Sequence, residues 1–389
     1  MFLAAAPYFQ TRFANSPWLL THFQSSIISV ATITNLISMI LLTKLQRNAS
    51  YPKRIIASLV INIVIFTLLA LSTAFFRHVS EGVYFGFLMV IVFTASLAAS
   101  LTQNGLLAYV SGFGVAEYMQ GIMTGQAVAG VLPCIAQIVA VLSVPERKAN
   151  EGAGQESPAS AFAYFMTATG ISSIALLAFF YLIQHHKHDK LAKQSIDGVE
   201  EAEEDDQVGR KVVGMRTLFR KLKWLAMAVF LVFSITMVFP VFTQEILSVR
   251  PIDSAPRWLK PPSFIPLAFL FWNAGDLVGR LMNLYPQITL FARPRAVFAG
   301  SILRTVFIPL YLLCNIKGRG PIIPSDFFYL FIVQFFFGLT NGYLGSTCMI
   351  AAASFVEVEE REAAGGFMGL ILVWGLTIGS LLSFLAAKA

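Results

Sequence analysis

Long apolar runs alternate with short polar segments along almost the whole chain. Ten runs are long enough to cross a bilayer as helices, which takes about 20 residues each. They lie near residues 22–43, 54–76, 83–111, 116–143, 161–183, 224–247, 264–285, 294–314, 327–353 and 364–387. This pattern predicts an all-α integral membrane protein built as a polytopic helical bundle.

The first apolar stretch, Met1 to Phe13, is too short to span a bilayer. It has no basic start ahead of an apolar core, so it does not have the form of a cleavable signal. We expect it to be the remnant of a first helix that begins upstream of this sequence.

Composition supports the membrane assignment and explains the basic balance. Of the 389 residues, 56% are hydrophobic and 13% are charged, which no ordinary soluble domain shows. The net charge of +7 could suggest nucleic acid, but the Lys and Arg residues lie between apolar runs. Alternate loops hold sixteen basic residues on one side and ten on the other, so the richer side is expected to be cytoplasmic. The expected partner is therefore the lipid bilayer, and binding to nucleic acid is not expected.

One connection is long and divides the chain. Residues 185–222 open with a histidine cluster, pass through an acidic run at 200–206 and close with basic residues. That composition is typical of a disordered, solvated linker. We expect helical bundles over 1–184 and 223–389, with a cytoplasmic linker over 185–222. Short histidine tracts at a basic membrane edge need no ligand, so no metal site is expected.

The run at 264–285 carries a full acid and a full base. Asp276 and Arg280 are four residues apart and share a helical face, which Asn273 extends. Each such charge costs roughly 2.5–3.5 kcal/mol at the centre of a membrane helix. Two interpretations are equally supported by these residues: the pair faces a polar substrate cavity, or it is a structural ion pair that fixes helix packing.

Two further polar residues stand inside apolar runs. Gln103 can donate and accept hydrogen bonds at once, which suits the edge of a heterocyclic base. Spacing alone favours an interhelical hydrogen bond instead. Arg304 is expected to reach the cytoplasmic edge of its helix and to bind backbone carbonyls.

Small residues repeat at intervals of four in several runs, which predicts faces where helices approach closely. These stripes are Gly275 and Gly279; Gly121, Gly125 and Ala129; Gly338, Gly342 and Ser346; and Gly375, Gly379 and Ser383. No nucleophile elbow, phosphate loop or metal-binding His-Glu pair is found, so an enzyme is not expected.

The segment Trp272-Asn273-Ala274-Gly275-Asp276-Leu277-Val278-Gly279-Arg280 resembles the Asn-x-x-Asp-x-x-Gly-Arg helix of equilibrative nucleoside transporters, and the chain is closest to their fungal type. Supporting segments follow in family order: Ile122 to Gln126, Leu303 to Asn315, Asn341 to Leu344, and Ala363 to Gly365 with the closing glycine-rich helix. The resemblance runs from Met1 to the end, excluding the linker.

The resemblance implies a major-facilitator-like architecture of six plus five helices, here with the first helix largely missing. The family's first helix carries a Leu-x-x-Trp-Asn stretch, and this chain begins after it. The resemblance also implies a central site open alternately to each side. Asp276 and Arg280 match the ribose-contacting pair and Gln103 matches the base-recognising glutamine, with Asn104 as the fallback. Asn273 and Phe239, before Pro240, match cavity-lining positions.

The expected function is facilitative transport of nucleosides, with nucleobases left open as a further substrate class. No cofactor and no obligate protein partner are implied, and the plasma membrane or a vacuolar, lysosome-like membrane is the expected location. Two alternatives stay open: a major-facilitator-type carrier of another polar solute such as a sugar, and a non-transporting membrane receptor or scaffold.

Overall fold

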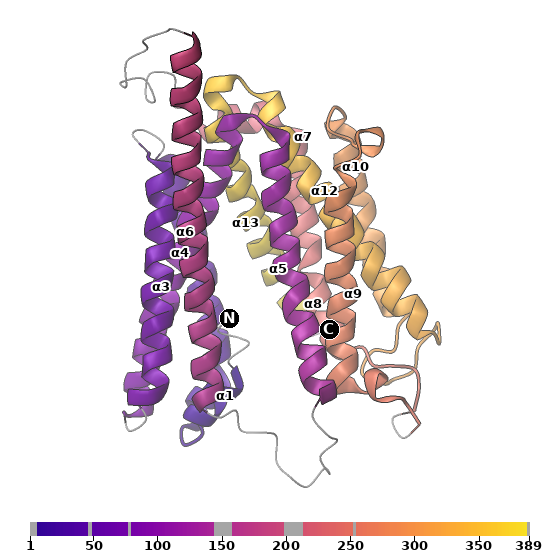
Figure 1. The fold of residues 1–389 in the computed structure, drawn as a ribbon. Helices are drawn as coiled ribbons and strands as arrows, with labels where there is room; N and C mark the ends of the chain where they lie inside the picture. The colour runs from indigo at the N-terminus through magenta and orange to yellow at the C-terminus, as the bar shows by residue number, and fades with distance from the viewer. Residues whose placement is uncertain are drawn as a thin grey trace. The chain divides into compact units, whose positions relative to one another are not determined.

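The computed structural model describes residues 6–45, 49–76, 79–143, 158–197, 213–251 and 254–386 (Figure 1). For residues 6–7, 140, 158–160, 186–197 and 384–386 it describes the backbone alone. The described chain is helical, and its one β-bridge is an isolated pairing of Ile246 with Ile316.

Each of the ten apolar runs forms a helical segment in the described chain. These segments are α2 (Pro17–Lys44), α3 (Tyr51–Phe75), α4 (Glu81–Phe113), α5 (Ala116–Ser143), α6 (Pro158–Asp197), α7 (Met215–Thr236) with α8 (Val238–Glu245), α9 (Pro261–Met282), α10 (Pro294–Leu303) with α11 (Phe307–Leu312), the π-helix η4 (Phe328–Phe335) with α12 (Phe336–Ala351), and α13 (Arg361–Ala386). The short helix α1 (Ala6–Arg12) precedes them. Short 3₁₀ turns are η1 (Arg257–Leu259), η2 (Pro286–Ile288), η3 (Arg304–Val306), η5 (Ala352–Phe355) and η6 (Val358–Glu360).

Nine of these segments, within the described residues, are long and apolar enough to cross a membrane. The chain is a multi-pass integral membrane protein, as predicted. Helix α9 is not among the nine, although it has 22 residues. Its polar groups, Asn273, Asp276 and Arg280, lower its mean hydropathy, so its place in the bundle depends on partners for those groups.

Three helices of the C-terminal half are interrupted near their middle. The α7–α8 break at Met237 comes just before Pro240, which cannot donate a backbone hydrogen bond. The turn η3 separates α10 from α11, and Pro309 lies within the first turn of α11. The third interruption is the change from the π-helix η4 to the α-helix α12. Such irregularities leave main-chain carbonyls in need of other donors.

The contacts divide the chain into two units. The first holds residues 1–109 and 147–211, and the second holds 110–146 and 212–389. The predicted division, 1–184 against 223–389, differs by one helix, because α5 packs along α9 in the second unit. Gly130 of α5 permits this close packing, because its missing side chain leaves room for the side chain of Asn273 on α9.

Helix occupies both ends of the predicted linker over 185–222. Helix α6 continues to Asp197, and α7 begins at Met215. The start of α7 is amphipathic: Leu218 and Leu222 are buried, while Arg216 and Arg220 are exposed. An apolar face that packs stabilises a helix that charge composition alone would assign to a loop. Residues 198–212, with the acidic run, lie outside the described residues.

The first unit has an aromatic core near one end. Phe9 and Phe13, from and after α1, are fully buried and pack with Phe23 of α2 and Tyr84 of α4. In the same unit α3 lies along α6. The apolar start of the chain therefore contributes to a core, which agrees with the expectation that it is helical.

Contacts inside the second unit place its connections at two ends. At one end, Lys221 of α7 binds Glu360 of η6 at 2.6 Å, and Trp224 packs against Phe298 of α10. At the other end, Asp326 accepts a hydrogen bond from the Ser248 hydroxyl at 2.7 Å. Alternate connections therefore share an end within this unit, as the charge count requires.

Candidate substrate site

Helices α9 and α12 meet backbone to backbone through four glycines. A Cβ at Gly275 or Gly279 would lie 2.1 Å or 2.0 Å from the carbonyl oxygen of Phe335 or Leu339. The contact is reciprocal, since a Cβ at Gly338 would meet the Trp272 carbonyl at 2.0 Å and one at Gly342 the Asp276 carbonyl at 1.9 Å. We call these four residues the glycine interlock; both stripes were predicted from sequence, and both predictions are confirmed.

The two other predicted stripes, on α13 and α5, differ in whether a neighbouring helix packs against them. On α13, a Cβ at Gly375 or Gly379 would lie 2.7 Å or 2.3 Å from a backbone oxygen of α7, so that close packing is confirmed. Within the described chain, nothing lies within 4 Å of a Cβ at Gly121 or Gly125 of α5, so the close packing predicted for that stripe is not found there. Small residues permit close approach, but a partner helix decides whether it occurs.

Because the glycines hold α9 against α12, the polar face of α9 is buried. Asp276 is 4% exposed and Arg280 is 8% exposed. Arg280 Nε donates to Asp276 Oδ2 at 2.8 Å. The predicted i, i+4 pair is therefore formed. Burial of both partners away from water makes this pair costly to break, because removal of one leaves an uncompensated charge.

Arg280 also joins α9 to α5. Its Nη1 donates to the Met123 carbonyl at 2.8 Å and to Gln126 Oε1 at 3.3 Å. In return, Gln120 Nε2 donates to the Arg280 carbonyl at 2.8 Å. Among the described residues, no hydrogen bond is made by Arg280 Nη2. One edge of the guanidinium is thus still able to donate.

The other carboxylate oxygen of Asp276, Oδ1, is the end of a chain of hydrogen bonds that does not involve Arg280. Asn341 Nδ2 on α12 donates to Asp276 Oδ1 at 2.6 Å. Thr236 Oγ1, in the last turn of α7, lies 2.7 Å from Asn341 Oδ1 and can donate to it. Arg304 Nη2 donates to Thr236 Oγ1 at 3.3 Å. We call Arg304, Thr236 and Asn341 the relay. In it, the neutral side chains of Thr236 and Asn341 connect the buried Arg304 to Asp276.

Arg304 is buried at the interrupted helices. It is 1% exposed, so the expectation that it reaches the membrane edge is wrong. The expectation that it binds carbonyls is confirmed, because its Nη1 donates to Val232 at 2.7 Å and its Nη2 to Phe337 at 3.3 Å. Its guanidinium also lies 4.7 Å from the centre of the Phe337 ring. The irregular stretches of α7, α10 and α12 expose groups that satisfy this side chain internally.

The aromatic and amide residues expected in the site lie on α9 or pack against it, in the turn before Asp276. Phe239 is buried and stacks on Trp272, with ring centres 4.4 Å apart. Asn273 is half-buried, and its Nδ2 donates to the Phe269 carbonyl at 2.8 Å. The Trp272 indole nitrogen is buried without a hydrogen-bond partner among the described residues. It is a donor that the sequence did not single out.

Gln103 lies on α4 in the first unit and is half-buried, with no hydrogen bond to another described residue. Its neighbour Asn104 is 1% exposed and accepts a hydrogen bond from Arg54 Nη1 at 2.6 Å. Asn104 is therefore committed to packing inside its own unit. Of the two residues considered for base recognition, only Gln103 has a side chain that a ligand could use.

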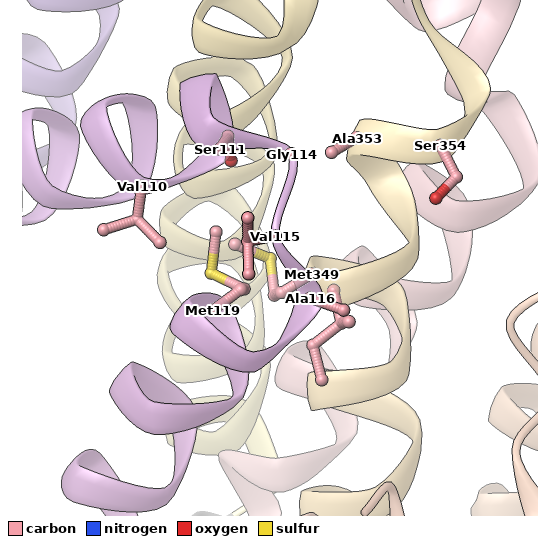
Figure 2. Close-up of a pocket in the computed structure, with 10 residues that line it drawn as sticks. Val110, Ser111, Gly114, Val115, Ala116, Met119, Met349, Ala353 and Ser354 are labelled. Carbon is pink, nitrogen blue, oxygen red and sulfur yellow. The ribbon is translucent and has the colours of Figure 1, made fainter. Parts of the chain in front are cut away.

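A small pocket opens beside the end of α12 in the second unit (Figure 2). Its walls are apolar or small and include Met119 of α5 and Met349 of α12, with Ser111 and Ser354 as the hydroxyl groups. It holds none of the predicted site residues and no charged side chain. A ribose needs several fixed polar partners, so this pocket does not fit the predicted substrate.

The sequence matches the model of the nucleoside transporter family over residues 88–388. The chain belongs to this family. Among its relatives, the nucleoside transporter FUN26 of Saccharomyces cerevisiae is 30% identical, over 93% of this chain and 75% of its own length. The human equilibrative nucleoside transporter 1 is 27% identical, over 92% of this chain and 81% of its own length.

A solved structure shows the same fold. The major facilitator superfamily transporter FucP, in its outward conformation, aligns with 98% of this chain and 94% of its own, with a TM-score of 0.55 at 12% identity. The family member described here therefore has the major-facilitator-like architecture that was predicted. At this identity the likeness concerns the fold alone.

Proposed function

We propose that this member of the family moves nucleosides across the membrane by facilitated, alternating access, and that Asp276 and Arg280 bind the ribose. The observation that carries the proposal is the state of the pair. Asp276 and Arg280 form a buried ion pair on α9, yet both side chains can still make further hydrogen bonds. Intramembrane ionisable groups of this kind typically mark a substrate pathway.

The remaining capacity fits a vicinal diol. A carboxylate has about four acceptor positions, and each oxygen of Asp276 uses one in the contacts described. Asp276 can therefore accept from two neighbouring hydroxyl groups, while Arg280 Nη2 donates to a ribose oxygen. Hydrogen bonds to charged groups are worth about 1.5–3 kcal/mol each, enough to distinguish ribose from a deoxy sugar.

Other residues are proposed for the base. Phe239 and Trp272 present stacked aromatic rings, and aromatic surfaces suit a planar heterocycle. The unpartnered indole N–H of Trp272 could donate to a ligand acceptor, and a buried donor left alone costs about 1–3 kcal/mol. Asn273 is proposed as a cavity-lining amide. The proposal for Gln103, in the first unit, rests on the resemblance and on the absence of a hydrogen bond from its side chain to any other described residue.

The test is uptake of labelled uridine into proteoliposomes that contain the purified full chain. We expect saturable uptake that excess unlabelled uridine or adenosine inhibits and that excess fucose does not. Inhibition by fucose but not by adenosine would support the sugar-carrier alternative. Absence of any flux for either solute, with the protein folded, would support the receptor or scaffold alternative.

A further inference from the structure

A cluster of exposed basic side chains lies where α7 and α10 begin. On α7, Arg216, Arg220 and Lys223 are spaced by four and three residues, so they share one face. On the start of α10, Arg293 and Arg295 are also exposed. We call these five residues the basic corner. Within the described chain none of the five forms an ion pair with a carboxylate.

Trp224 joins the two halves of this corner. Its ring packs against Phe298 of α10 with centres 5.4 Å apart. Lys223 Nζ lies 5.3 Å from the centre of the Trp224 ring, and the Arg295 guanidinium carbon lies 5.8 Å from it. Tryptophan is enriched where a span meets the lipid headgroups. The ring therefore marks the depth of the interface and keeps one cation from each helix at that depth.

The surface next to the cations is apolar. On α10, Arg295, Ala299 and Ile302 follow one face at intervals of four and three, and all three are exposed. Ile302 is 49% exposed and the adjoining Leu303 is 68% exposed. A surface that changes from charge to hydrocarbon along one helix fits an amphiphile. It does not fit a soluble polyanion such as nucleic acid, which has no apolar part to cover Ile302 and Leu303.

We propose that the basic corner binds an anionic phospholipid of the cytoplasmic leaflet, with its phosphate between Lys223 and Arg295 and its acyl chains along α10. Charge counting places this end of the second unit on the cytoplasmic side, where anionic lipids are concentrated. If these basic residues served only to orient the protein in the membrane, their charges would be enough. Neither a tryptophan shared by two cations nor the meeting of two helices would be needed. The proposal does not depend on which solute is carried.

The test measures lipid retention by the purified full chain with native mass spectrometry, using phosphatidylserine and phosphatidylcholine at equal concentration. The double variant Lys223→Gln with Arg295→Gln is compared with Arg250→Gln and Arg319→Gln, which remove two exposed charges from the other end of the same unit. We expect the corner variant to bind phosphatidylserine at least ~10-fold more weakly, since each basic residue near the surface contributes about 5-fold. The control should match the unmodified protein.

Equal retention of phosphatidylserine by the two double variants would overturn the proposal. So would equal retention of the two lipids by the unmodified protein. A third variant, with the acidic residues of 200–206 changed to Asn and Gln, tests the chain's own acidic segment as occupant. If phosphatidylserine binds only in that variant, the segment and not the lipid is the resident partner, and the proposal fails. Inorganic phosphate at millimolar concentration should not displace the lipid; displacement would assign the site to the free anion.

Discussion

At the scale of single residues, Asp276 separates a substrate role from a structural one. Asp276→Asn keeps the shape of the side chain but removes its charge. We expect nucleoside uptake per molecule to fall at least ~10-fold, because a hydrogen bond to a charged group is worth ~1.5–3 kcal/mol. Discrimination between uridine and its 2′,3′-dideoxy analogue should weaken as well. The measurement is uptake normalised to folded protein in the membrane.

A purely structural Asp276 makes a different prediction for the same variant. The amount of folded protein would fall, while uptake per molecule and discrimination between the two analogues would be unchanged. That result would remove Asp276 from the proposed substrate site.

The relay can be tested with two threonines that both accept from Arg304. Thr236 accepts at 3.3 Å and lies on the path to Asn341, whereas Thr340 accepts at 3.2 Å and does not. We expect Thr236→Val to reduce uptake ~3–10-fold, since the amide that orients Asp276 loses a hydrogen bond worth about 0.5–1.5 kcal/mol. Thr340→Val should stay within about 2-fold. Equal losses in the two variants would mean that the path from Thr236 to Asn341 contributes no more to uptake than the contact with Thr340.

Sequence reasoning found the local part of this site and missed the distant part. The Asp276–Arg280 contact could be predicted because a helix brings residues four apart together. Asn341 could not, since it lies 65 residues from Asp276 and reaches it only through the glycine interlock. Arg304 was placed at the membrane edge because an arginine near a helix end usually finds water there. The interrupted helices that satisfy it internally have no simple sequence period.

At the scale of elements, the glycine interlock fixes how α9 lies on α12. Gly342→Ala would place a methyl group 1.9 Å from the Asp276 carbonyl, which is backbone and cannot move aside. We expect no folded protein or an apparent Tm lower by several degrees, since overpacking typically costs 1–3 kcal/mol or more. Gly86→Ala on α4 is the matched control, because no atom of the described residues lies within 4 Å of its added carbon. Thermal unfolding in detergent distinguishes the two, and similar Tm values would contradict the interlock.

Element boundaries were predictable where hydrophobicity decides them. All ten runs became helical segments. Helix α7 begins inside the predicted linker because its charged residues occupy an exposed face while its apolar residues are buried. The stripe on α5 shows that regular spacing of small residues does not by itself predict a packing partner. Its spacing is as regular as that of α12, but Gly121 and Gly125 meet no partner among the described residues. Spacing therefore identifies helices that could pack closely and leaves the partner to the tertiary structure.

At the scale of the whole molecule, the remaining prediction concerns sidedness. Alternate connections share an end within the second unit, and charge counting assigns the end with Lys221 and Trp224 to the cytoplasm. A protease site inserted within 198–212 should therefore be cleaved only from the cytoplasmic face. Deletion of those residues should leave uptake intact, because their composition cannot build a core. Cleavage from the opposite face would reverse the topology.

The pairing of α9 with α12 has a consequence for biogenesis. Helix α9 alone is not among the segments apolar enough to insert by composition, and Asn341 and the glycines that complete it belong to α12. The ribosome makes α12 only after α9, α10 and α11 have emerged. A nascent chain that ends before Phe336 therefore presents Asp276 to the insertion machinery without the amide of Asn341, and α9 without the glycines of α12. We expect α9 to enter the lipid stably only when α12 arrives, so truncation between these helices should leave α9 extractable from the membrane by alkali.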